Sequence, residues 1–224
     1  RELMGEITSA QVDAGQAVYG KFSLAAYDRL VLGVSCSYLW RCDAPTLLAR
    51  YNRFVSGNHI DVGVGSGYFL DHCRFPTATP RVALMDLNEN SLAHTAHRIR
   101  RYNPECYRRN VLEDMSVGGE PFDSIGMNLL LHCVPGDFAY KGRIFDNALT
   151  VMAPGAVLFG ATILSEGIKP GWVARRLMNL YVQKGIFSNQ HDSAEALRTE
   201  LEARFVDVEV TVHGCMALFS ARNK

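Results

Sequence analysis

A cluster of glycines follows a short apolar stretch, and an acidic residue opens it. The cluster reads Asp61-Val62-Gly63-Val64-Gly65-Ser66-Gly67-Tyr68. Glycines at such a turn let the backbone adopt conformations closed to other residues and approach a ligand closely. Asp86 ends the next apolar stretch, where a carboxylate can accept hydrogen bonds from both hydroxyls of a ribose. The combination predicts a nucleoside pocket at the carboxyl ends of the first two strands.

The spacing of the glycines indicates which kind of nucleoside cofactor the loop binds. Dinucleotide-binding loops follow the pattern G-x-G-x-x-G, whereas here the third glycine comes one residue earlier. A carboxylate at the loop entrance, Asp61, suits a cationic group better than a diphosphate. An NAD-dependent dehydrogenase is therefore a disfavoured alternative. The loop resembles motif I of the class I S-adenosylmethionine (SAM)-dependent methyltransferases, which implies that Asp61 faces the ammonium end of the cofactor's methionine.

The resemblance continues in order along the chain. The second motif of that family is matched by Asp86-Leu87-Asn88, and the segment that contacts adenine is matched by Asn110-Val111-Leu112. Residues 122–135 resemble the fourth strand, with Asn128 beside the cofactor, and its substrate-facing loop, with Pro135 beside the substrate; residues 152–156 resemble the turn before the fifth strand. The family usually has an acidic residue near the adenine amino group, where this chain has Asn110. The match implies SAM as cofactor, S-adenosylhomocysteine (SAH) as product and a small-molecule acceptor.

Apolar stretches of strand type alternate with helical patterns after residue 56. We expect strands at 59–63, 81–86, 106–109, 122–128, 157–164, 206–212 and 215–221, with helices at 68–74, 90–102, 140–152, 171–183 and 192–204. Asp192 has the spacing of a capping box with Glu195. This order predicts an α/β fold, a Rossmann-like doubly wound seven-stranded sheet that is mostly parallel and ends in an antiparallel hairpin. We expect a helical cap over 1–55, one methyltransferase domain over 56–224 and a lid near 165–190.

The expected cap and lid are rich in aromatic residues. The segment 27–42 resembles the cap of small-molecule methyltransferases of microbial, especially fungal, secondary metabolism. Tyr19, Tyr27 and Trp40 in the cap, with Trp172 in the lid, are candidates to cover the cofactor and acceptor, since an aromatic face stabilises a nearby cation by about 0.5–2 kcal/mol. Packing between helices explains the same residues equally well.

His132 is the candidate catalytic residue. It follows the fourth strand, where the acceptor is expected, and an ordinary histidine titrates near neutral pH. The expected chemistry is direct displacement at the methyl group, which needs a base only where the acceptor must lose a proton. His132 is therefore a base or a residue that orients the acceptor, and a plain core histidine is the alternative.

Composition excludes several other classes of function. The 23 Lys and Arg balance the 23 Asp and Glu, so neither nucleic acid nor a membrane surface is an expected partner. No apolar run approaches the roughly 18–20 residues of a membrane span. The six cysteines lack a metal-ligand spacing, which predicts free thiols, a cytoplasmic location and no metal. The chain is expected to be a monomer or a homodimer.

Two alternatives keep the SAM pocket without methyl transfer. One is a cyclase or pericyclase-like enzyme that uses the bound sulfonium as an electrostatic aid, and it would release no SAH. The other is a non-catalytic SAM-binding protein, which would bind the cofactor without turnover on any acceptor.

Overall fold

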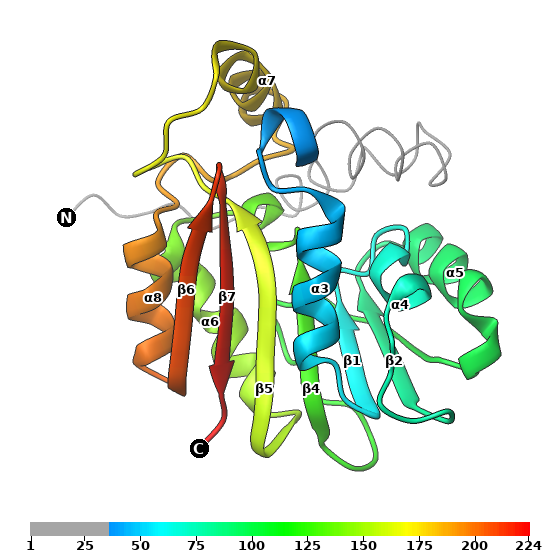
Figure 1. The fold of residues 1–224 in the computed structure, drawn as a ribbon. Helices are drawn as coiled ribbons and strands as arrows, with labels where there is room; N and C mark the ends of the chain where they lie inside the picture. The colour runs from blue at the N-terminus through cyan, green and yellow to red at the C-terminus, as the bar shows by residue number, and fades with distance from the viewer. Residues whose placement is uncertain (1–35) are drawn as a thin grey trace.

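The computed structural model describes residues 36–224, which form a seven-stranded sheet covered by helices (Figure 1). The strands are β1 (Asn58–Val62), β2 (Arg81–Asp86), β3 (Glu105–Arg108), β4 (Phe122–Asn128), β5 (Met152–Ile163), β6 (Val206–His213) and β7 (Met216–Arg222). Their order is β3-β2-β1-β4-β5-β7-β6. Strands β1 to β5 pair in parallel, and β7 is antiparallel to both β5 and β6. The predicted fold class, including the terminal hairpin, is confirmed.

Helices cover both faces of the sheet. They are α3 (Ala44–Phe54), α4 (Tyr68–His72), α5 (Glu89–Arg98), α6 (Phe138–Leu149), α7 (Trp172–Gln183) and α8 (Ala194–Glu202), with short 3-10 helices η3 (Arg100–Tyr102) and η4 (Leu131–Cys133). One buried cluster joins α3, α4 and α5 to one face, and another joins α6 and α8 to the opposite face. Figure 1 shows α7 apart from these layers, beyond the end of β5. A chain with apolar residues on both faces of its parallel strands requires such a double cover.

Helix α3 packs directly on the sheet. Asp43 caps its first turn by accepting a hydrogen bond from the Thr46 amide at 2.9 Å, and Pro45 follows the cap. The Tyr51 ring stacks on Phe69 at 5.6 Å and meets Phe159 of β5 edge-on at 5.1 Å. This part of the expected cap therefore shares the core of the sheet. Tyr19 and Tyr27 lie outside the described residues.

Two predicted boundaries around α6 and β5 are wrong. The side chain of Asp137 accepts from the Tyr140 amide at 3.0 Å, so α6 begins at Phe138, and it ends at Leu149. Strand β5 begins at Met152, because the expected turn at Pro154-Gly155 is absorbed as a register shift opposite β4. Gly155 permits this irregularity with a φ of 75°.

The prediction that Asp192 caps the last helix is also wrong. Ser193 is the N-cap of α8 and accepts from the Ala196 amide. The Asp192 carboxylate instead accepts two hydrogen bonds from Lys141 of α6, at 2.7 and 2.9 Å, and both side chains are fully buried. Burial raises the pKa of Asp192 to about 6 and lowers the pKa of Lys141, and the attraction between the two opposes both shifts. The carboxylate is thus ionised at neutral pH.

Two further features concern the helices and the cysteines. Across residues 36–224, no helix has both the length and the apolar character that crossing a membrane requires. All six cysteines fall in this part of the chain and are free thiols, as predicted.

Replacing Lys141 with Met tests the buried pair. Lys141→Met leaves the Asp192 carboxylate buried without its cation, so we expect the free energy of unfolding to fall by about 3–5 kcal/mol. Urea unfolding followed by circular dichroism measures this loss. The double variant Lys141→Met, Asp192→Leu removes both charges and should recover most of the stability. If Lys141→Met is as stable as the parent protein, Asp192 does not need the buried cation, and the prediction is wrong.

Candidate active site

The glycine loop lies between β1 and α4 and lines a pocket. The lining residues are Asp61, Gly63, Val64, Gly65, Ser66, Gly67, Tyr68, Phe69, Leu70, Asn128 and Leu129. Gly65 has a φ of 51°, and a Cβ atom added there would meet nothing within 4 Å. The loop therefore presents bare backbone to an open space, as a closely held ligand requires.

The third glycine serves a helix contact. Gly67 has a φ of 73°, and a Cβ atom there would lie 2.7 Å from Cγ2 of Thr95. The missing side chain lets the start of α4 approach α5 closely.

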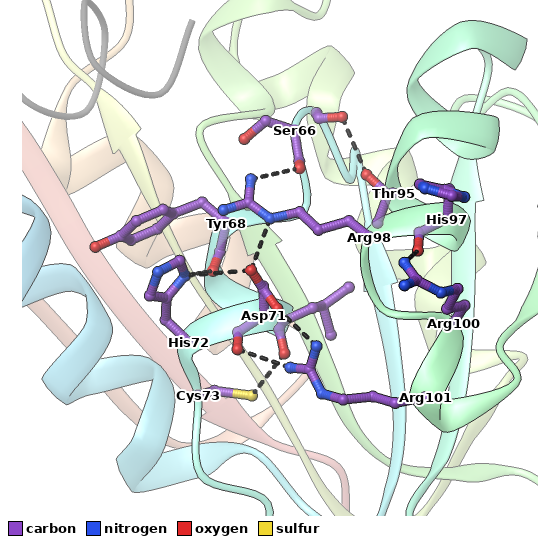
Figure 2. A network of polar contacts seen from close by, with 12 residues as sticks. Ser66, Tyr68, Asp71, His72, Cys73, Thr95, His97, Arg98, Arg100 and Arg101 are labelled. Atoms are coloured by element: carbon purple, nitrogen blue, oxygen red, sulfur yellow. Dashed lines mark hydrogen bonds and ion pairs between the residues drawn. The ribbon is translucent and has the colours of Figure 1, made fainter. Parts of the chain in front are cut away.

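Side chains of α5 donate hydrogen bonds to carbonyl groups of the glycine loop (Figure 2). The Thr95 hydroxyl donates to the carbonyl of Gly65 at 3.2 Å, and the Arg98 guanidinium donates to the carbonyl of Ser66 at 3.0 Å. Both carbonyl groups are thereby fixed toward α5. The loop conformation is consequently set by side chains about thirty residues further along the chain.

Asp71 of α4 completes this arrangement. Its carboxylate accepts from Arg98 at 2.9 Å and from Arg101 at 2.7 Å. Burial alone would raise the pKa of Asp71, but the two guanidinium groups hold it below its usual value. These arginines therefore fasten α4 to the end of α5 (Figure 2).

Asp86 lies at the end of β2, beside the loop. Its carboxylate accepts from the amide of Asn88 at 2.9 Å. Burial raises the pKa of Asp86, and hydrogen bonds from backbone amides, including those of Gly65 and Val64, oppose the rise. The neighbouring Asn88 caps α5 through its side chain, and half-buried Leu87 lies between the two. The second motif is thus brought next to the first.

The segment after β3 is organised by Asn110. Its side-chain oxygen accepts from the Leu112 amide at 3.1 Å, and its nitrogen donates to Glu113 at 3.2 Å. The carbonyl of Val111 accepts from Asn147 of α6, and Leu112 is buried. Because β3 pairs in parallel with β2, this segment leaves the same edge of the sheet as Asp86.

Asn128 ends β4 and lines the same pocket as Asp61. Its Nδ2 atom is buried and has no hydrogen-bond partner among residues 36–224. An unpaired buried donor costs about 1–3 kcal/mol, so a ligand oxygen there would relieve it. The pocket thus offers a carboxylate acceptor and a free amide donor, which fit the ammonium and carboxylate groups of an amino acid.

His132 lies in η4 and is 4% exposed. Its Nδ1 accepts from the amide of Ile163 at 3.4 Å, so the ring proton lies on Nε2. The ring meets Phe187 edge-on at 4.6 Å. Burial, together with the positive charge of Lys141, lowers the pKa of His132 to about 3. The side chain is therefore neutral at physiological pH.

The other predicted substrate contacts within residues 36–224 are not among the residues that line the glycine-loop pocket. Trp40 is 2% exposed and packs against Phe187 at 6.0 Å, in a cluster that includes Met178 of α7. Pro135 is buried after η4. Trp172 opens α7 and is 76% exposed. Of the predicted cofactor contacts, Tyr68 lines the pocket and stacks on His72 at 4.2 Å.

Tyr51 and His59 were not predicted as site residues. The Tyr51 hydroxyl lies 2.5 Å from Asp61 and 2.8 Å from Nε2 of His59. The sequence gives one signal for His59, which is a histidine inside an otherwise apolar strand. It gives none for Tyr51, because no local pattern links this residue to Asp61. A metal has no comparable site in the described part of the chain, where no three His, Cys, Asp or Glu residues are grouped to hold one.

Known proteins share this architecture and sequence. A family profile described as a methyltransferase domain matches residues 60–158. Demethylluteothin O-methyltransferase of Streptomyces thioluteus is 41% identical over 94% of this chain and 92% of its own. A physcion biosynthesis cluster O-methyltransferase of Aspergillus chevalieri is 35% identical over 93% of this chain and 95% of its own.

A solved structure extends the likeness to the whole fold. The complex of DhpI with SAH superposes with a TM-score of 0.70 at 15% identity, and the match covers 97% of this chain and 98% of DhpI. That likeness concerns the fold alone, whereas the two relatives share sequence over nearly their full lengths. The chain belongs to the class I SAM-dependent methyltransferases that act on small molecules.

Proposed function

We propose that the protein transfers the methyl group of SAM to a hydroxyl oxygen of a small secondary metabolite, by direct displacement. The observation that carries the proposal is the open pocket at Gly65, with Asp61 and Asn128 in its lining and Asp86 beside the loop. The choice of oxygen rests on the two relatives, both of which are named O-methyltransferases.

Each cofactor contact has a distinct role in this proposal. Asp61 accepts from the ammonium group, the unpaired Nδ2 of Asn128 donates to the carboxylate, and Asp86 accepts from the ribose hydroxyls. The segment from Asn110 to Leu112 borders the adenine. Bound SAM supplies an electrophilic methyl group on a positively charged sulfur. The protein's contribution is to align the acceptor with that group and to exclude water.

His132 orients the acceptor in this proposal. A histidine with a pKa of about 3 has little tendency to take up a proton near neutral pH, so it is a poor general base. Its Nε2–H can instead donate a hydrogen bond to an acceptor oxygen. Pro135 after η4 and the aromatic residues of α7 would border the acceptor, which we expect to be largely apolar.

We also propose a location and an oligomeric state. The free thiols of all six cysteines support a cytoplasmic location, and the active unit is a monomer or a homodimer.

A cyclase-like reaction and cofactor binding without catalysis are the rival functions. The names of the relatives favour methyl transfer over both.

Calorimetric titration with SAM, SAH and NAD tests the cofactor first. We expect micromolar binding of SAM and SAH and no binding of NAD. Incubation with SAM and a panel of phenolic and enolic acceptors should then release SAH and a product heavier by one methyl group. A modified acceptor without SAH release would favour the cyclase-like function, and binding without any turnover would favour the non-catalytic one.

Asp86→Ala should weaken SAM binding by roughly 1–3 kcal/mol through the lost ribose contacts. Calorimetry measures the change, with Asp123→Ala as the control because Asp123 is exposed at the opposite end of β4. Unchanged affinity in Asp86→Ala would remove Asp86 from the cofactor site.

Substitution of His132 separates the two roles considered for it. We expect His132→Ala to lower kcat/KM about 10- to 100-fold with little change in SAM affinity, and His132→Gln, which keeps a donor, to lose less. Because the histidine is already neutral above a pKa of about 3, the pH profile of kcat/KM between pH 5 and 8 should keep its shape in His132→Gln. An acid limb near pH 6–7 that vanishes in this variant would establish His132 as the base instead.

A further inference from the structure

A chain of buried hydrogen bonds ends on Asp61. The Tyr51 hydroxyl lies 2.5 Å from Oδ2 of Asp61 and 2.8 Å from Nε2 of His59. On the other side of the imidazole, Nδ1 lies 2.8 Å from the hydroxyl of Ser124 on β4. We call these four residues, Ser124, His59, Tyr51 and Asp61, the Tyr51 relay. All four are buried.

The direction of every bond in the relay follows from chemistry. The Tyr51 hydroxyl donates to the carboxylate oxygen of Asp61. Burial and the neighbouring Asp61 raise the pKa of Tyr51 well above its usual value, so the phenol keeps this proton. The phenol oxygen then accepts from Nε2–H of His59, which leaves Nδ1 to accept from Ser124.

The far end of the relay is consistent with this assignment. Ser124 accepts a hydrogen bond from the Ser56 amide at 2.9 Å. The Ser56 hydroxyl lies 2.8 Å from the Ser124 hydroxyl and can donate to it, which leaves the hydroxyl proton of Ser124 for His59. All three side-chain bonds therefore point toward the carboxylate. Hydrogen bonds aligned in one direction polarise and strengthen one another in a low dielectric.

The relay engages one oxygen of the carboxylate. Tyr51 and His59 both lie near Oδ2, and the pairing of β1 with β4 places Asp61 opposite Gly126. A Cβ atom at Gly126 would come within 3.0 Å of that same Oδ2. Glycine at this position thus leaves room for the relay. The second oxygen, Oδ1, is left for the pocket that Asp61 lines.

We infer that Tyr51 and His59 are positioning residues for the amino acid end of the cofactor, because they fix the Asp61 carboxylate with one oxygen available to the ammonium group. The inference rests on the proposed role of Asp61. It makes cofactor affinity depend on α3, a helix that contributes no residue to the pocket lining. A relay that only stabilises the core would affect all ligands of the pocket equally.

The test compares SAH with 5′-methylthioadenosine, which keeps the nucleoside and the sulfur but lacks the amino acid group. Titration calorimetry gives both dissociation constants for the parent protein and for Tyr51→Phe. We expect the variant to bind SAH roughly tenfold more weakly, because a charge-assisted hydrogen bond is lost, and to bind 5′-methylthioadenosine within about twofold of the parent. Equal losses for the two ligands, or no loss, would overturn the inference.

Two further variants complete the design. Tyr140→Phe on α6, which packs on the opposite face of the sheet, is the matched control and should bind both ligands as the parent does. Asp61→Asn tests the proposed function separately. If Asp61→Asn keeps full affinity for SAH, the proposed role of Asp61 fails. If it loses affinity while Tyr51→Phe does not, only the relay inference fails.

A pair of variants at His59 decides the matter if Tyr51→Phe does not fold. His59→Leu removes the donor to Tyr51, whereas the amide of His59→Gln can still donate to the phenol oxygen. We expect His59→Leu to weaken SAH binding severalfold and His59→Gln to retain most of it, with 5′-methylthioadenosine unaffected in both. Equal SAH affinities in the two variants would overturn the inference.

Discussion

The hydrogen bond from the Tyr51 hydroxyl to the Asp61 carboxylate joins a helix on the face of the sheet to the strand that carries the glycine loop. A carboxylate at a buried strand end is costly unless polar partners satisfy it. Here the phenol supplies that partner, and the relay behind it supplies the alignment. The bond also ties α3 to β1, so one interaction serves both the packing of the helix and the electrostatics of the pocket.

The glycine loop is also fixed by side chains of α5. Thr95 and Arg98 of α5 fix the carbonyl groups of Gly65 and Ser66, while Tyr51 fixes the carboxylate at the loop entrance. Backbone that must stay open to a ligand cannot be stabilised by its own side chains, because glycines have none. Side chains of the neighbouring helices α3 and α5 therefore stabilise the loop and its entrance.

The surroundings of His132 depend on a second buried charge. Lys141 donates to Asp192 and to the carbonyl of Ser188, and the Ser188 amide donates to the carbonyl of His132. This chain of contacts joins α6, η4 and the segment that follows α7. Burial lowers the pKa of His132, and the positive charge of the same lysine lowers it further, so the histidine stays neutral.

The sequence alone determined the features that depend on local chemistry: the alternation of strands and helices, the glycine loop, and the acidic residue at the end of β2. These follow from side-chain periodicity and from backbone conformations that few residues tolerate. Only the tertiary structure decided the partners of charged and polar groups. Asp192 has the spacing of a helix cap yet pairs with Lys141, which lies 51 residues away, and His132 looks like an ordinary base until burial lowers its pKa. The sequence around Tyr51 does not indicate its role. That role arises only where α3 packs against β1, because polar groups buried at this contact must form hydrogen bonds.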